Sequence, residues 1–334
     1  MKKTTIPLYE QETFIVKDRI PELDTKEFVG PFAKVHKFNG GMLEASSQLV
    51  IGDKIVAENI LMKPNCACAI SQSNKRYLET YSIYTDYVEP NQLLFRALGF
   101  SENESKVLVY VKSVSYIPVY AIVTGYNLEE GNLLMPRLPV SFALKNNAEI
   151  AYEDAVEVIA DWLKANGMDI NSLPQVIYIS AEAKAYARQK VKEEHKQLEL
   201  ARLYECAVII LEDIAKLSVV AYMVLQKKYH EAGFIIAKLQ LSWGMDDDSC
   251  LVLCDEVGTA DNTFIASREL YEKNGILESI INAPVLKYFE SIGYDVNSDK
   301  PVPEIPEDVL DEISDTYVYL TEAICDDLAC DIHM

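Results

Sequence analysis

The sequence has few basic residues for its size. Among 334 residues, 31 Lys and Arg stand against 52 Asp and Glu, which gives a formal net charge of −21. A chain this acidic repels a phosphate backbone and an anionic membrane surface, so we expect neither nucleic-acid nor membrane binding through overall charge. A local basic cluster can still hold a small anionic substrate. The imbalance is strongest in residues 301–334, with ten acidic side chains and no Lys or Arg.

Long apolar runs are also missing. No stretch approaches the ~20 apolar residues of a membrane-spanning helix, and no apolar segment of signal-peptide length follows the first residues. The cysteine count is odd, at seven. Without a secretory signal, this indicates reduced thiols and a cytoplasmic protein.

Three groups of Cys and His have spacings that could be read as metal ligands. They are Cys66 with Cys68, Cys250 with Cys254, and Cys325 with Cys330 and His333. Zinc sites more often show paired Cys-x-x-Cys knuckles, whereas Cys250 and Cys254 flank an apolar segment. We therefore interpret these cysteines as small core residues.

Common catalytic motifs are absent. The sequence contains no GxGxxG, GxxxxGK[ST], HExxH or GxSxG pattern, and none of its four histidines belongs to a ligand pair. Motifs alone therefore indicate no function. We base the functional interpretation on the order of the predicted helices and strands instead.

The residues that are present predict two lobes, because the chain exceeds the usual size of one domain and is 49% hydrophobic. Residues 1–115 are predicted to form an antiparallel β-rich lobe with a helical piece near 90–98. Its expected strands are 14–16, 42–51, 55–62 and 107–114.

Residues 116–334 are predicted to form a mixed α/β lobe. We expect a strand at 174–180 and a hairpin at 234–255. Helices are expected at 152–166, 181–231, 284–293 and 307–323.

The first hairpin strand carries polar residues at every second position. Strict alternation puts Lys238, Gln240 and Ser242 on one face. This face is either exposed to solvent or lines a cleft, and the alternation does not decide between them. Asp255 and Glu256 end the return strand, where carboxylates are well placed to hold a cation.

Five stretches together resemble the SAICAR synthetase family. Their order and spacing are more specific than any one of them, and they lie at 109–126, 142–147, 232–244, 253–261 and 303–324. The family joins aspartate to a carboxylated aminoimidazole ribonucleotide with ATP and magnesium. The resemblance implies an α+β, two-lobed fold similar to a protein kinase or ATP-grasp clamp, a nucleotide substrate and possible homo-oligomers.

The resemblance also implies roles for individual residues. It makes Asp255 a magnesium ligand and catalytic residue, together with Lys238. The segment 30–38 is similar to the nucleotide loop of the family and makes Lys34 a phosphate contact. The other implied residues bind the cofactor (Lys112 and Gln240) or the substrate (Tyr126, Asn132, Lys145 and Asp261).

Several family positions are replaced. Arginines that hold the substrate phosphate fall at Thr124 and Phe264, and a magnesium-binding Glu falls at Ser242. A guanidinium suits phosphate and a carboxylate suits magnesium, so these changes matter chemically. Arg137 or Arg268 are candidates to replace the lost arginines. The family's Glu after Pro-Val falls at Tyr120.

Three hypotheses follow. The chain is an ATP-dependent carboxylate–amine ligase, either SAICAR synthetase itself or a paralogue with a changed substrate. Alternatively, it is a catalytically inactive family member that binds a nucleotide or a protein partner. The third reading is chance similarity in an unrelated two-lobed α+β protein.

Overall fold

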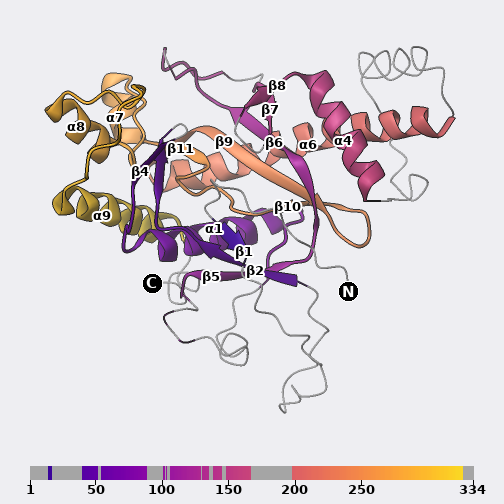
Figure 1. Ribbon diagram of the computed structural model, residues 1–334, viewed down its shortest axis with the longest axis horizontal. Coiled ribbons are helices and arrows are strands. Elements are labelled where there is room, and N and C mark those ends of the chain that lie inside the picture. The colour runs from indigo at the N-terminus through magenta and orange to yellow at the C-terminus, as the bar shows by residue number, and fades with distance from the viewer. Residues whose placement is uncertain are drawn as a thin grey trace.

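The computed structural model describes residues 14–16, 40–51, 54–88, 101, 103, 106–128, 130–134, 138–144, 148–166 and 198–325 (Figure 1). The predicted pieces at 90–98 and 174–180, and the helical part at 181–197, lie outside these residues. Within the described part, no helix is long and apolar enough to cross a membrane.

A six-stranded antiparallel sheet forms the centre of the molecule. Its strand order is β10 (Leu251–Cys254), β9 (Phe234–Met245), β6 (Ser115–Thr124), β7 (Val140–Ala143) and β8 (Glu149–Ile150), and β11 (Thr263–Ser267) also pairs with β9. β9 and β10 are the predicted hairpin, joined by a turn that begins at Asp246, whose backbone N–H donates to Cys250 O. The predicted alternation in β9 therefore belongs to a real strand.

The remaining strands form two smaller sheets. β1 (Phe14–Val16), β2 (Gly40–Ala45) and β5 (Leu108–Lys112) make one, and β3 (Leu49–Ile51) and β4 (Lys54–Ala57) make the other. Every pairing in both sheets is antiparallel, as predicted for the first part of the chain. The division into lobes at 115/116 stays a prediction, although the chain does change sheets between β5 and β6.

A short segment connects the three-stranded sheet to the central one. Thr85 forms a parallel bridge with Leu253 of β10, and Tyr87 forms an antiparallel bridge with Val111 of β5. Asp86 donates its backbone N–H to Leu253 O and accepts the N–H of Lys112. We call residues 84–87 the splice segment, because its backbone hydrogen bonds reach both sheets.

Two helices cover one face of the central sheet. α4 (Tyr152–Ala165) and α6 (Leu198–Glu231) pack on each other and on β6, and α6 also packs on β9. The main hydrophobic cluster lies between them, and Leu239, Leu241 and Trp243 of β9 belong to it. The prediction of helices at 152–166 and before Gly233 is confirmed for the described residues.

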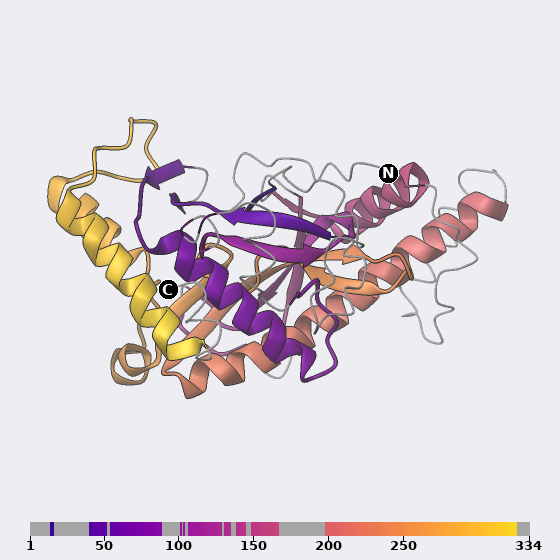
Figure 2. The same cartoon turned by 90° about the horizontal axis from the view of Figure 1, so that it is seen from below.

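The C-terminal helices pack at the other end of the molecule. α8 (Ala283–Ile292) and α9 (Glu307–Ile324) follow β11 and the short α7 (Arg268–Asn274). α9 lies beside α1 (Lys63–Glu79), as Figure 2 shows. α8, α9 and the β3–β4 ribbon share a second hydrophobic cluster around Phe289 and Tyr317.

The sequence interpretation missed α1, because it expected mostly strand in the first 115 residues. Thirteen of the 17 residues of α1 are buried, so the helix shows no polar face and no amphipathic period. Cys66, Ala67, Cys68 and Ala69 are fully buried, which fits the interpretation of these cysteines as small core residues. Cys254 is buried as well, but Cys250 is exposed beside the turn before β10, so the interpretation as a core residue is wrong for Cys250. No disulfide joins any of the six cysteines in the described residues.

A close approach at Gly125 gives a test of the packing of α6 on the sheet. A Cβ at this position would lie 1.7 Å from the hydroxyl of Tyr222, which donates a hydrogen bond to Ile236 O at 2.7 Å. We expect Gly125→Ala to destabilise the fold by about 1–3 kcal/mol through overpacking, measured by urea unfolding. Adding Tyr222→Leu should recover part of the loss, since the two positions are in contact. A change below about 0.5 kcal/mol in the single variant would contradict the described contact.

Candidate functional site

The face of the central sheet opposite α4 and α6 carries the polar residues of β9. The register pairs Tyr120 with Ser242, Ile122 with Gln240, and Thr124 with Lys238. Phe264 of β11 pairs with Lys238 from the other side. Directly paired residues of antiparallel strands project from the same face. We call these seven residues the polar sheet face.

Exposure changes along the polar sheet face. Tyr120, Ile122 and Ser242 are 6%, 3% and 5% exposed, whereas the side chain of Lys238 is 40% exposed. Solvent exposure therefore does not explain Ser242. The Lys238 ammonium lies 3.6 Å from a carboxylate oxygen of Glu149, and such an exposed ion pair is worth only about 0–1 kcal/mol. Glu149 can thus be exchanged at small cost for another carboxylate.

The replaced positions come together on this face. Thr124 and Phe264 flank Lys238 on the two neighbouring strands, and Ser242 lies four residues further along β9. Thr124 and Phe264 carry no charge, so neither supplies a guanidinium for a phosphate beside Lys238. Gln240, predicted to bind the cofactor, lies between Lys238 and Ser242 and is half-buried.

Asp255 follows β10 in a left-handed backbone conformation, with φ at 63°. Asp adopts this conformation more readily than most residues other than Gly, and Asn59, Ser82 and Ser249 share it in the described residues. The backbone N–H of Asp255 donates to Asp86 Oδ2 at 3.3 Å, and its Oδ2 accepts a hydrogen bond of 2.8 Å from the Tyr116 hydroxyl. Backbone and side chain of Asp255 are therefore both held.

A buried ion pair adjoins Asp255, because one of its members, Asp86, accepts the backbone N–H of Asp255. Lys75 of α1 lies 2.6 Å from Asp86 Oδ1, and the two side chains are 0% and 2% exposed. Burial raises the pKa of Asp86, the Lys75 ammonium lowers it, and the neighbouring Asp255 carboxylate raises it; the net pKa stays above its ordinary value. Sequence reasoning missed Lys75, Asp86 and Tyr116, because no motif links positions this far apart.

Asp261 belongs to a separate polar cluster. Its Oδ1 lies 3.0 Å from the Lys63 ammonium, and the Tyr317 hydroxyl of α9 lies 3.4 Å from its Oδ2. Burial raises the pKa of Asp261, and the nearby Lys63 and Tyr317 only partly offset the rise. The structure thus ties Asp261 to α1 and α9 rather than to Asp255, although both residues lie in the β10–β11 connection.

The other predicted residues lie at several places. Lys112 is 55% exposed, with its ammonium 3.4 Å from Thr85 O and 4.0 Å from a Glu79 carboxylate oxygen. Tyr126 is buried edge-on against Tyr271. Exposed Asn132 donates to Glu130. Lys34, Arg137 and Lys145 lie outside the described residues.

The chemistry of the donors fits magnesium only in part. Among the residues that the structure describes, no three His, Cys, Asp or Glu side chains come together as metal ligands. Asp86 is engaged by Lys75 and by the Asp255 N–H, and Glu256 is buried at 4% exposure, so Asp255 remains the proposed magnesium ligand. Magnesium in nucleotide sites is commonly bound through one or two carboxylates plus phosphates. The residues therefore fit an ion that arrives with a nucleotide, and would hold it through Asp255.

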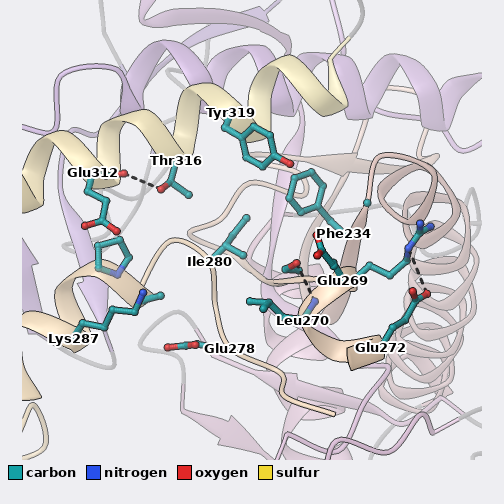
Figure 3. A pocket seen from close by; sticks show the side chains of 15 residues that line it. Phe234, Glu269, Leu270, Glu272, Glu278, Ile280, Lys287, Glu312, Thr316 and Tyr319 are labelled. Atoms are coloured by element: carbon teal, nitrogen blue, oxygen red, sulfur yellow. Dashed lines mark hydrogen bonds and ion pairs between the residues drawn. The ribbon is translucent and has the colours of Figure 1, made fainter. Parts of the chain in front are cut away.

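A hollow of about 550 Å³ lies elsewhere, among α7, α8, α9 and the start of β9 (Figure 3). Phe234 and Tyr319 stand on one side of it and Lys287 on another. Arg268 lines it, with Nη1 donating to His230 O and Nε 3.5 Å from Glu272. Phe234 and Ser242 are eight residues apart on β9, or about 26 Å in an extended strand, so Arg268 is not close to Ser242 or Asp255.

The overall fold of the chain is similar to solved structures with the same α+β fold. The Saccharomyces cerevisiae SAICAR synthase complexed with SAICAR aligns with a TM-score of 0.57 at 17% identity, over 85% of this chain and 88% of that one. Another SAICAR synthase structure gives a TM-score of 0.56 at 16% identity. The chain thus has the α+β fold of these structures.

A comparison of the sequence with protein families identifies the family of the chain. The profile of the SAICAR synthetase family matches residues 34–279, and the chain belongs to this family. The reading of chance similarity is therefore wrong.

Identity to individual relatives is low. Phosphoribosylaminoimidazole-succinocarboxamide synthase of Desulfatibacillum aliphaticivorans is 29% identical over 116 residues, which are 35% of this chain and 38% of the relative. The synthase of Neisseria meningitidis serogroup A is 25% identical over 224 residues, 65% of this chain and 69% of the relative. The chain spans about two fifths of the first curated relatives it matches.

Proposed function

We propose that the chain is an ATP-dependent carboxylate–amine ligase of the SAICAR synthetase type, with a substrate that differs from that of the family. The observation that carries the proposal is the support around Asp255. A left-handed backbone, the Asp86 carboxylate and the Tyr116 hydroxyl all fix this residue. Hydrogen bonds of this kind fix the orientation of a ligating carboxylate.

The altered substrate is inferred from the residues beside Lys238. Thr124 and Phe264 leave that part of the polar sheet face without a guanidinium. A substrate with no phosphate at this place fits better than a ribonucleotide phosphate. Lys238 would pair with a substrate carboxylate in exchange for Glu149, its exposed partner.

Bound Mg·ATP would supply the phosphoryl group that activates a carboxylate towards an amine. The chain's own residues would orient the reactants: Asp255 towards the magnesium ion, and Lys238 towards the carboxylate. Lys34 and Lys112 remain proposed nucleotide contacts, and Tyr126, Asn132, Lys145 and Asp261 remain proposed substrate residues.

A second candidate function is a catalytically inactive family member that binds a nucleotide or a protein partner. The observation in its favour is Ser242, a neutral and buried hydroxyl within the polar sheet face. A hydroxyl is a poor substitute for a carboxylate towards a hard divalent cation. Under this function the nucleotide would bind without turnover.

The proposal places the protein in the cytoplasm, in line with the lack of disulfides among the cysteines that the structure describes. Its ligands would be small molecules rather than nucleic acids, and it would be able to form homo-oligomers. It also keeps the division into a β-rich nucleotide-binding lobe, 1–115, and a substrate lobe, 116–334.

Thermal unfolding with ATP tests the proposal. At a hundredfold excess over its dissociation constant, a ligand that binds only the folded chain adds about 2.7 kcal/mol of stability. We expect such a rise with Mg·ATP, and we expect Asp255→Asn to reduce it. Asp161→Asn, an exposed carboxylate on α4, is the matched control and should leave it unchanged. No shift at millimolar Mg·ATP contradicts both candidate nucleotide functions. A shift with no ATP turnover in the presence of carboxylates and amines selects the second.

A further inference from the structure

The connection between β10 and β11, residues 255–262, is buried over much of its length although it forms no regular strand or helix. Val257 is fully buried, and Glu256 is 4% exposed. A loop in this position must find partners for its backbone N–H and C=O groups inside the protein, because water does not reach them. Asp255, the proposed magnesium ligand, begins this connection, and Asp261, a proposed substrate residue, lies near its end.

The side chain of Asn74 on α1 binds the middle of this connection. Its amide nitrogen donates to Val257 O at 3.0 Å and to the Tyr229 hydroxyl at 2.9 Å. The Tyr229 hydroxyl in turn donates to Gly258 O. Gly258 has a left-handed backbone, with φ at 72°, and a Cβ there would lie 2.4 Å from Asn74 Nδ2. A glycine is therefore required for the connection to approach Asn74 this closely.

The orientation of the Asn74 amide is defined by its partners. Its nitrogen has two hydrogens, one for Val257 O and one for the Tyr229 hydroxyl, and its oxygen accepts a hydrogen bond from the Lys228 ammonium at 3.0 Å. A flipped amide would place its oxygen against Val257 O and its nitrogen against the Lys228 ammonium, so these contacts would be lost. Asn74 and Tyr229 are each 0% exposed, so water does not take their place.

This anchor lies a very short piece of chain from Asp255. Ser71, also on α1, accepts the Val257 N–H at 3.1 Å, so α1 binds both backbone polar groups of Val257. On the other side, the Asp255 N–H donates to Asp86 Oδ2 at 3.3 Å. Glu256 is the one residue between these two anchored positions. The backbone at Asp255 therefore has little freedom as long as Val257 is held.

We infer that Asn74 is a positioning residue that fixes Asp255 through the backbone of Val257 and Gly258. Loss of the two Asn74 donors would loosen the connection and let the Asp255 carboxylate turn away from the magnesium ion of a bound nucleotide. The inference deepens the proposed function and rests on it for the role of Asp255 towards Mg·ATP. The part that concerns the backbone rests on the hydrogen bonds of Asn74 alone.

The isosteric variant Asn74→Asp tests the inference, because it keeps the size of the side chain and replaces both donors by an acceptor oxygen. We expect the Asp255 amide to exchange its hydrogen at least tenfold faster than in wild type, measured by NMR without ligand. We also expect Mg·ATP to bind at least tenfold more weakly. Tyr229→Phe keeps the ring and removes only the hydroxyl, so it should have a smaller effect of the same kind, and it provides the test where Asn74→Asp does not fold.

Ile159→Ala is the control for a general loss of stability. Ile159 is a fully buried residue of α4, a helix that packs on α6, β6 and β7, and its truncation leaves a cavity there. This variant should leave both the exchange rate of the Asp255 amide and the affinity for Mg·ATP at their wild-type values.

Three outcomes overturn the inference. They are an Asp255 amide that exchanges at the wild-type rate in both Asn74→Asp and Tyr229→Phe, an acceleration that Ile159→Ala reproduces, and faster exchange with an unchanged affinity for Mg·ATP. Absence of Mg·ATP binding to wild type refutes the proposed function instead. In that case the exchange rates without ligand still decide whether Asn74 fixes the backbone at Asp255.

Discussion

Replacing Lys75 by Met should destabilise the fold by about 3–5 kcal/mol, because it leaves Asp86 as an uncompensated buried charge. The two side chains are 0% and 2% exposed, so water cannot take over the role of the ammonium. Asp86 also accepts the Asp255 N–H. The loss should therefore appear both as a lower midpoint in urea unfolding and as weaker Mg·ATP binding.

Two controls separate the buried charge from other effects. Lys216→Met removes an exposed cation of α6 that lies 3.5 Å from Glu212, and it should cost no more than about 0.5 kcal/mol. The double variant Lys75→Met/Asp86→Leu removes both charges, and it should be more stable than Lys75→Met, since an apolar pair often replaces a buried ion pair at little cost. A double variant less stable than the single one would contradict this account.

Replacing Lys63 by Met should cost a similar ~3–5 kcal/mol at neutral pH, with a defined dependence on pH. Lys63 is 1% exposed and lies 3.0 Å from Asp261. Burial already raises the pKa of Asp261 above its ordinary value of 3.8, and Lys63 is the largest influence that lowers it. Without Lys63 the pKa of Asp261 rises further.

The sign of the pH effect follows from proton binding. With a raised pKa, the folded chain holds the Asp261 proton more tightly than the unfolded chain does. The destabilisation therefore grows as pH rises from 3.8 through the raised folded pKa, and it shrinks as pH falls. Urea unfolding at pH 5 and pH 8 should show a smaller difference between Lys63→Met and wild type at pH 5. Lys273→Met, an exposed cation of α7, should show no such change, and equal losses for Lys63→Met at both pH values would contradict the mechanism.

Local patterns were sufficient for much of the fold. The helix at 152–165 begins with acidic residues, and α8 has Pro284 in its first turn and a left-handed Gly293 at its end, features that are visible in sequence. α1 was missed because it is buried nearly all round. β11 and α7 were missed because both are short. The sequence interpretation of that part of the chain considered only its polar candidate site residues.

The candidate site, like the fold, could be predicted only where a local sequence pattern determines it. Strand periodicity placed Lys238, Gln240 and Ser242 on one face, and their register with β6 bears this out. The support of Asp255 could not be predicted, because it joins α1, the splice segment and the start of β6. The pairing of β6 with β9 is irregular between Tyr116 and Tyr120. Alternation of polar and apolar residues does not reveal such an irregularity, so the contact of Tyr116 with Asp255 could not be predicted.

The splice segment also determines how displacement passes through the molecule. Asp86 is hydrogen-bonded through its backbone to Leu253 on one side and to Lys112 on the other. A movement of β5 is therefore transmitted by stiff backbone contacts to a point two residues before Asp255. A ligand that shifted the three-stranded sheet would therefore also shift Asp255 without touching it.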